Sequence, residues 1–286
     1  MSEWPLLIFT LLVQASVGLT LFGAWYSYWM AQELAQEQHF TTLRPLLLMV
    51  CLMAGTGLLA SVAHLGYPLN AFHALRHVGT SWLSREILFA SLYLGIMCLV
   101  TLLALLTRRI QPALLAIGGL VGLADVYCMA EIYFHSTVIG WMHIHTHVSF
   151  YSAVIALGAV LALLFASRAV LSAPLVRRLL VTTLLLTAAS AACQLLVMPD
   201  YLHQMAQRLA SQPVTLPFDM QLAFQHGAAL RLLSWILLLG GLTMLLWMLY
   251  RNNPRAQSPS RILLSMAAGL VMLAHVASRY AFFTLH

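Results

Sequence analysis

The sequence predicts an all-α protein in which eight transmembrane helices form a single bundle. Of its 286 residues, 62% are hydrophobic and only 8% are charged, whereas soluble domains have about 25% charged residues. The apolar residues also gather in eight runs, each close to the roughly 20 residues that a helix needs to cross a bilayer core. Little length is left for a soluble domain, so we expect one membrane domain over residues 1–286.

The predicted spans follow one another along the chain with mostly short connections. Proline stands near the start of three of them, at Pro5, Pro45 and Pro112, where its missing N–H costs no hydrogen bond. Other prolines, including Pro199, lie in the connections, where we expect them to end helices. The spans are residues 5–30, 45–66, 87–107, 112–134, 147–167, 179–198, 227–250 and 262–285.

Arginine predicts the orientation, because all 14 basic residues are arginine. The first, third, fifth and seventh connections hold nine arginines, and the even connections with the last helix hold five. Since cytoplasmic loops are enriched in basic residues, the odd connections are predicted to be cytoplasmic and both termini periplasmic. We interpret the net charge of +6 as this topology signal and expect no nucleic-acid partner, because no basic patch is interleaved with aromatic residues.

The connection over residues 61–86 concentrates polar side chains and is the predicted functional site. His64 ends the second span, and Glu86 begins the third. A quinol must lose two protons as it loses two electrons, and an imidazole that titrates near neutral pH suits that acceptor role. We predict His64 as the proton acceptor and Glu86 as its orienting or relaying carboxylate. The alternative is a histidine at the membrane interface beside a helix-end ion pair of Arg85 and Glu86.

Further residues are predicted to line the same quinol pocket. Tyr67, Phe72 and Trp82 are placed to form a flat apolar wall, with an aromatic belt at the membrane interface as the alternative, which is favoured for Trp82. Arg279, near the outer end of the last helix, is predicted to face this pocket or an external subunit. The polar members of the connection are Asn70, His73 and Arg76.

Two carboxylates lie inside the fourth span, where an ionisable group is costly and by default indicates function. Asp125 lies deep and Glu131 lies near the outer end, on nearly opposite faces of the same helix. For Asp125, a place on a proton path and a structural contact between helices remain open alternatives.

Metal and haem chemistry have weaker signals. His143, His145 and His147 alternate, which would place them on one face only in an extended backbone. Because this segment is expected to enter a helix that splays the rings, we predict no metal site. A haem b would need two axial histidines facing each other across the bundle, and spacing alone supports no such pair. A haem b quinol-oxidising anchor is the alternative.

Cysteines and the longest loop complete the pattern. Each cysteine lies in an apolar run with no CxxC pair, so we expect neither a disulfide nor an iron–sulfur cluster in this chain. The sixth connection, residues 199–226, is the longest predicted loop, and its role in docking a partner stays open. A small-molecule transporter is a further alternative, against which we find no inverted repeat. The cysteines are Cys51, Cys98, Cys128 and Cys193.

Four separate segments of the chain carry recognisable motifs: EWPLLIFT at 3–10, HLGYPLNAF at 64–72, VGTSWLSRE at 78–86 and RYAFFTLH at 279–286. Together they resemble the DmsC-type membrane anchor subunit of the dimethyl sulfoxide reductase family. The resemblance covers essentially the whole chain and is poorest from the fourth helix through the sixth connection. Its most specific parts are the H-L-G-x-P and S-x-E motifs.

The resemblance implies an eight-helix anchor in a bacterial inner membrane, with periplasmic termini and no haem. It implies menaquinol oxidation near the periplasmic face, electron transfer to an iron–sulfur subunit with 4Fe–4S clusters, and a molybdopterin catalytic subunit that determines the terminal acceptor. The motif histidine corresponds to His64 and the motif glutamate to Glu86. Family members carry arginine, asparagine and glutamate where this chain has Asn70, His73 and His275, which indicates a divergent member.

Overall fold

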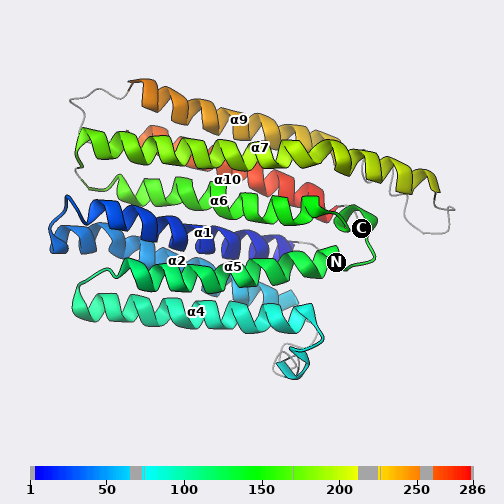
Figure 1. The fold of residues 1–286 in the computed structure, drawn as a ribbon, viewed down its shortest axis with the longest axis horizontal. Helices are drawn as coiled ribbons and strands as arrows, with labels where there is room; N and C mark the ends of the chain where they lie inside the picture. The colour runs from blue at the N-terminus through cyan, green and yellow to red at the C-terminus, as the bar shows by residue number, and fades with distance from the viewer. Residues whose placement is uncertain are drawn as a thin grey trace.

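The computed structural model describes residues 4–64, 73, 75–169, 171–211, 225, 227–251 and 260–284, with only the backbone of 63, 64 and 209–211. Within this part of the chain all regular secondary structure is helical and there is no strand, which confirms the all-α prediction. Figure 1 shows eight long helices side by side. The elements are α1 (Trp4–Met30), α2 (Gln36–His64), η2 (Leu75–His77), α4 (Trp82–Thr107), α5 (Pro112–Phe134), η3 (Ile139–Trp141), α6 (Ile144–Ala166), α7 (Ala173–Ser211), α9 (Ala228–Arg251) and α10 (Arg261–Phe283).

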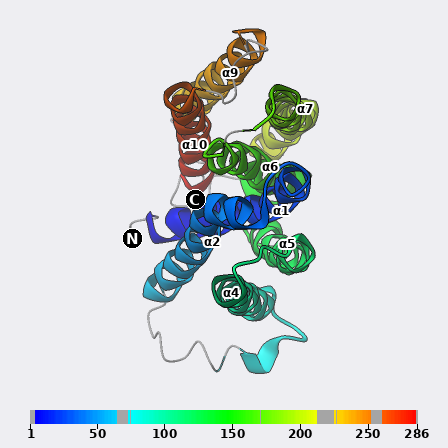
Figure 2. The ribbon, with the colours of Figure 1, turned by 90° about the vertical axis from the view of Figure 1, so that its left-hand side faces the viewer.

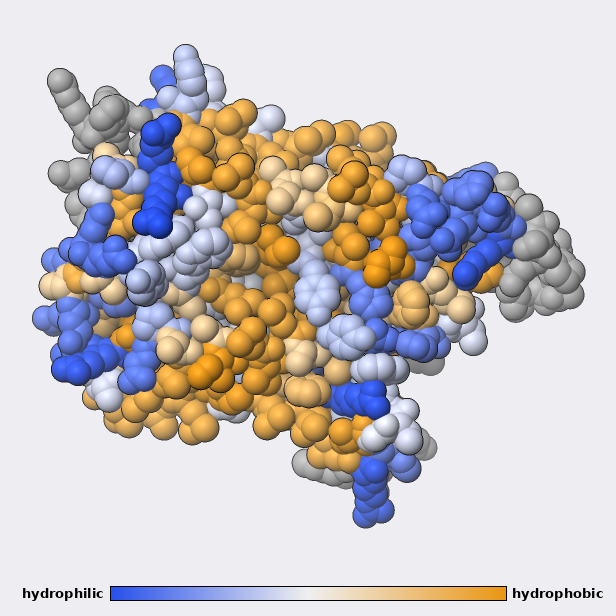
Figure 3. Space-filling model, in the orientation of Figure 1, coloured by the Kyte–Doolittle hydropathy of each residue, from blue (hydrophilic) through white to orange (hydrophobic). Residues whose placement is uncertain are grey.

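All eight long helices are suited to a membrane. Their most apolar stretches have mean hydropathies of 1.6 to 2.4. An apolar band crosses the middle of the visible surface, and hydrophilic residues gather at its two ends (Figure 3). An apolar band of this kind suits contact with lipid, and the hydrophilic ends suit contact with water. The chain is therefore a multi-pass membrane protein.

The first and last helices meet at one end of the bundle (Figure 1). The ring centres of Trp4, in the first turn of α1, and Tyr280, in the last turn of α10, lie 5.6 Å apart. We call this end the N/C end. The C-terminal ends of α2, α5 and α7 also lie here, so the even-numbered predicted connections start on the same side of the bundle as both ends of the chain.

The first helix is the centre of the bundle (Figure 2). It packs against α2, α5, α6, α7 and α10, and most of its residues from Leu7 to Met30 are buried. An apolar helix that is buried on nearly all sides needs no polar face. Its own polar residues, such as Gln14 and Ser16, are therefore buried and must find partners within the bundle.

Two glycines allow α1 and α6 to cross at backbone contact. A Cβ atom on Gly18 would overlap the carbonyl oxygen of Val154, and one on Gly158 would overlap the backbone of Gly18. Small residues at such crossings are the usual way in which transmembrane helices approach closely. The crossing fixes the position of α6 against the central helix.

The second helix begins earlier than predicted, at Gln36 rather than at Pro45. A proline inside a helix removes one hydrogen bond and costs about 3 kcal/mol. Tertiary contacts offset this cost, because Phe40 and Leu43 are buried and His39 Nε2 lies 2.9 Å from the hydroxyl of Ser27 on α1. The polar stretch before Pro45 is therefore helical.

The sixth long helix also differs from the prediction, because α7 continues through Pro199 to Ser211. In Figure 1 this extension projects beyond the other helices at the N/C end. Its buried residues Tyr201 and Met205 pack against the body of the bundle. The prediction that a helix ends at Pro199 is therefore wrong, and residues 199–211 of the predicted loop are helical. The rest of that loop lies outside the described residues, except 225.

Candidate functional site

The predicted quinol site is described only in part. The backbone of His64 forms the last residue of α2, but its side chain lies outside the described residues. His73 is exposed, and so is Arg76, which lies in η2 against α4. Tyr67, Asn70 and Phe72 lie outside the described residues altogether.

Glu86 lies inside α4, because this helix begins at Trp82 rather than at residue 87. Ser81 caps it: its backbone is extended and its hydroxyl accepts a hydrogen bond from the backbone N–H of Ser84 at 3.4 Å. The cap starts the helix early enough to turn Glu86 inward, where it is 6% exposed. Arg85 faces outward and donates to the carbonyl oxygens of Val78 at 2.8 Å and Gly79 at 2.7 Å. Arg85 therefore contacts the connection before α4, whereas Glu86 faces the interior of the bundle.

Asp125 of α5 is a second buried carboxylate on the same side of α1. Its side chain is fully buried, and neither oxygen has a hydrogen-bond partner among the described residues. Glu86 lies near enough for the two carboxylates to interact electrostatically. An unpartnered buried carboxylate is expensive, so this residue is a stronger candidate for a role in proton movement than its sequence position indicated.

A buried tyrosine links this region to the central helix. The hydroxyl of Tyr93 lies 2.8 Å from the hydroxyl of Ser16 and 2.8 Å from that of Thr20. Tyr93 also interacts electrostatically with Asp125. Glu86, Asp125, Tyr93 and Ser16 thus form a line of buried polar groups from the N/C end towards the middle of α1.

Arg279 lies in a different place. Its side chain is 4% exposed, its Nη2 donates to Oε1 of Gln14 at 2.8 Å, and its guanidinium carbon lies 3.7 Å from the ring centre of Phe150. These contacts hold it between α10, α1 and α6, whereas α4 lies on the opposite side of α1 (Figure 2). The structure therefore does not bring Arg279 together with Glu86.

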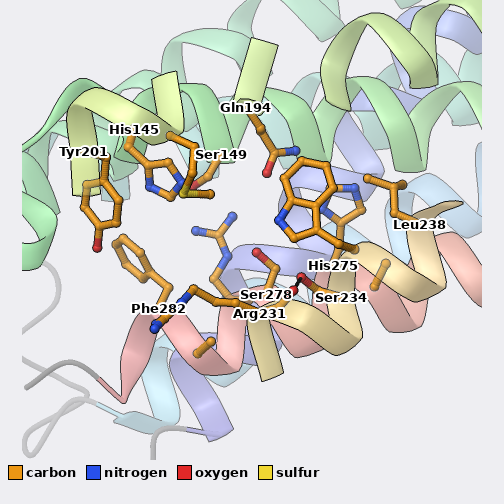
Figure 4. A pocket seen from close by; sticks show the side chains of 15 residues that line it. His145, Ser149, Gln194, Tyr201, Arg231, Ser234, Leu238, His275, Ser278 and Phe282 are labelled. Atoms are coloured by element: carbon orange, nitrogen blue, oxygen red, sulfur yellow. Dashed lines mark hydrogen bonds between the residues drawn. The ribbon is translucent and has the colours of Figure 1, made fainter. Parts of the chain in front are cut away.

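Arg279 instead lines a cavity of about 50 Å³ between α6, α7, α9 and α10 at the N/C end. Figure 4 shows His145 and Tyr201 on one side of this cavity, with Gln194 and His275 on the other. We call it the arginine cavity. Its lining residues are His145, Ser149, Gln194, Met198, Tyr201, Arg231, Ser234, Trp235, Leu238, Ala274, His275, Ser278, Arg279, Ala281 and Phe282.

The alternating histidines point to different partners, as predicted for a segment that enters a helix. His143 is the N-cap of α6, and its Nε2 lies 2.9 Å from Oδ2 of Asp200 on α7. His145 stacks on Tyr201, with ring centres 4.4 Å apart. Within the described part of the chain, no three His, Cys, Asp or Glu side chains are arranged to hold a metal ion.

The third histidine of the run belongs to a cluster around Glu131. Nε2 of His147 lies 3.1 Å from one carboxylate oxygen of Glu131, and Nδ1 of His135 lies 3.0 Å from the other. Trp82 of α4 stacks on His135, with ring centres 6.1 Å apart. Glu131 is thus fully partnered, in contrast to Asp125, and ties α5 to α6 at the N/C end.

Sequence reasoning found Arg279 but not the cavity that it lines. His275 and Arg279 are four residues apart, and this spacing places them on one face of a helix. That spacing was visible in the sequence. The other residues that line the cavity lie on α6, α7 and α9, which are remote from α10 in the sequence. Gln194 and Tyr201, for example, lie on either side of Pro199, where the sequence indicated a helix end.

Comparisons with known proteins agree with this architecture. The family model for the DMSO reductase anchor subunit (DmsC) matches residues 1–285. The C subunit of the anaerobic dimethyl sulfoxide reductase of Escherichia coli (strain K12) is 28% identical over 293 residues, covering 99% of this chain and 95% of its own length.

Two further relatives match over about half of their length. The anaerobic dimethyl sulfoxide reductase subunit YnfH of Escherichia coli (strain K12) is 33% identical over 165 residues, 56% of each protein. The C subunit of the Haemophilus influenzae (strain ATCC 51907 / DSM 11121 / KW20 / Rd) reductase is 28% identical over 156 residues, 54% of each protein. No solved structure matches the chain. Eight membrane-spanning helices and a family match over the whole chain show that this protein belongs to the DMSO reductase anchor subunit (DmsC) family.

Proposed function

We propose that this chain anchors a molybdoenzyme reductase to the bacterial inner membrane and oxidises menaquinol there. Its electrons pass to an iron–sulfur partner subunit with 4Fe–4S clusters and then to a molybdopterin catalytic subunit, which determines the terminal acceptor. Membership of the anchor family supports the anchoring role. The excess of arginine in the connections opposite the N/C end supports a periplasmic N/C end, where both partners dock.

The observation that carries the proposal is the burial of Glu86 at the N/C end. Glu86 lies in the second turn of α4, at the end of the bundle where α2 ends with His64. A buried carboxylate at this end supports a role in taking up the protons that a quinol releases there. In this proposal His64 accepts the proton of a quinol hydroxyl, and Glu86 orients the imidazole or relays the proton outward. Proton release on the side where the electrons are consumed makes the step electroneutral.

The connection after α2 supplies the rest of the proposed pocket. In this proposal Tyr67 and Phe72 contribute an apolar wall, and Asn70, His73 and Arg76 contribute polar groups. We leave Arg279 out of this pocket, because it lines the arginine cavity on the other side of α1.

Binding of a quinol analogue tests the proposal. Membranes that contain the chain and its coexpressed partner subunits are titrated with a fluorescent hydroxyquinoline N-oxide, and menaquinol-dependent turnover is measured in parallel. His64→Ala and Glu86→Gln are compared with Glu37→Gln, an exposed glutamate at the opposite end of the bundle.

We expect both site variants to lose turnover by at least about 100-fold, the lower range for general acid–base catalysis, and His64→Ala to lose inhibitor quenching. The complex should still assemble, and Glu37→Gln should behave as wild type. Unchanged quenching and turnover in His64→Ala would place the quinol site elsewhere. A Soret band in the purified chain would favour the haem b anchor instead.

A further inference from the structure

Arg279 brings a buried positive charge to the arginine cavity. Among the described residues that line the cavity there is neither an aspartate nor a glutamate that could pair with Arg279. Arg279 is 4% exposed, and the partners that the structure gives it, Gln14 and the Phe150 ring, are uncharged. A buried cation that lacks a counter-ion costs several kcal/mol, so an anion in this cavity would be strongly stabilised.

Several polar atoms around the cavity are also left without a hydrogen bond. Among the described residues, Nη1 of Arg279 has no partner, and neither does Nε2 of His275, although both side chains are more than nine-tenths buried. Nε2 of Gln14, behind Arg279, has none either. Nearly all buried polar atoms in proteins are paired, so the unpaired nitrogens of Arg279 and His275 indicate a missing acceptor between them.

The size of the cavity limits what that acceptor is. One water molecule needs about 10–15 Å³ of such space, so 50 Å³ accommodates about three to five water-sized atoms. A phosphate group, with one phosphorus and four oxygen atoms, has this size.

The depth of the cavity matches the head-group layer of a membrane. Arg279 lies four residues before the end of α10 at Phe283, which is about 6 Å along the axis. Arg231 lies three residues after the start of α9 at Ala228, or about 5 Å. The polar layer on each side of a bilayer is about 5–8 Å thick, so both arginines lie at or just below the lipid phosphates.

The inner part of the cavity suits the apolar side of a lipid. Met198, Trp235 and Leu238 line it below the arginines, and the neighbouring residues Ile236 and Leu239 of α9 are exposed on the outside of the bundle. A ligand with a phosphate at the arginines would thus have apolar side chains beneath it. An anionic phospholipid has this chemistry, whereas a free phosphate ion does not use the apolar part.

We propose that the arginine cavity binds the phosphate group of an anionic phospholipid, with Arg279 and His275 donating to its oxygens and Arg231 contributing charge at its edge. Arginine is well suited to this task, because its planar fork offers paired donors to a phosphate. The proposal does not rest on quinol oxidation, since the cavity lies across α1 from Glu86. In this proposal the phosphate of a structural lipid is the counter-ion of the buried Arg279.

Lipid binding to the full chain tests the proposal. The chain is purified, delipidated in a neutral detergent and titrated with phosphatidylglycerol, with phosphatidylcholine or with inorganic phosphate, and the shift in its thermal unfolding midpoint gives the affinity. Arg279→Gln and Arg231→Gln are compared with Arg109→Gln, which removes an exposed arginine at the opposite end. Arg231 is only partly buried, so its variant keeps the test valid if Arg279→Gln fails to fold.

We expect phosphatidylglycerol to stabilise wild type and Arg109→Gln equally, and its affinity to fall at least tenfold in the cavity variants. Phosphatidylcholine should bind more weakly, because its choline group cancels the charge of the phosphate. Stabilisation by inorganic phosphate to the same extent, lost in the same variants, would confirm the oxyanion site and overturn the lipid as its source. Equal binding of phosphatidylglycerol to wild type and both cavity variants, or no binding at all, would overturn the proposal.

Discussion

Arg279 of α10 donates a hydrogen bond from Nη2 to Oε1 of Gln14 of α1, at 2.8 Å, and both side chains are buried. The contact joins the last helix to the central one across 265 positions of sequence. It fixes one edge of the guanidinium, and Nη1 has no hydrogen-bond partner within the described part of the chain. The stability of the N/C end and the properties of the arginine cavity therefore depend on the same residue.

Replacing Gln14 by leucine should destabilise the chain without changing its bulk greatly. The arginine loses its acceptor inside the bundle, and a hydrogen bond to a charged group contributes about 1.5–3 kcal/mol. Thermal unfolding of the purified chain measures the loss. The control is Gln32→Leu, at an exposed position in the turn after α1, which should unfold as wild type does. An unchanged midpoint for Gln14→Leu would show that the contact contributes no stability.

The crossing of α1 and α6 gives a second prediction. Gly158→Ala places a methyl group against the backbone of Gly18, which cannot move aside as a flexible side chain can. We expect a loss of about 2–3 kcal/mol or more. Gly95→Ala is the matched control, because nothing lies within 4 Å of the added Cβ, and alanine is the better helix former by about 1 kcal/mol. Equal stability of the two variants would contradict the close crossing.

Asp125→Asn distinguishes a proton path from a structural contact between helices. The carboxylate has no described hydrogen-bond partner to lose, so the variant should be at least as stable as wild type. If Asp125 relays protons, menaquinol-dependent turnover falls by about tenfold or more, while binding of the quinol analogue persists. A less stable variant with normal turnover would instead support the structural contact. Turnover, inhibitor quenching and the unfolding midpoint are measured on the same preparation.

The contact between His143 and Asp200 predicts a small coupling energy. The two side chains lie 2.9 Å apart, but the aspartate is 62% exposed, so solvent weakens the interaction. A double-mutant cycle with His143→Ala, Asp200→Ala and both together should give a coupling of about 0.5–1 kcal/mol. Strictly additive losses would show that the extension of α7 is held by other contacts, such as the stacking of Tyr201 on His145.

The boundaries of two helices show where local signals were insufficient. Proline usually marks a helix end, yet Pro45 and Pro199 lie inside α2 and α7. In both cases residues beyond the proline are buried against another helix: Phe40 lies before Pro45, and Tyr201 lies after Pro199. The free energy of these long-range contacts offsets the missing hydrogen bond, and no rule based on neighbouring residues includes it.

The sequence by itself determined the membrane class, the number of spans and the splayed histidines, because these follow from apolar run length and helical period. It also indicated Asp125, since a carboxylate within an apolar run is conspicuous, and Glu86, which stands at the polar start of the third span. Only the tertiary structure decided that Asp125 has no hydrogen-bond partner among the described residues while Glu131 has two, and that Arg279 lies across α1 from Glu86. Which side chains share a cavity depends on how helices pack, and packing joins residues that no sequence spacing relates.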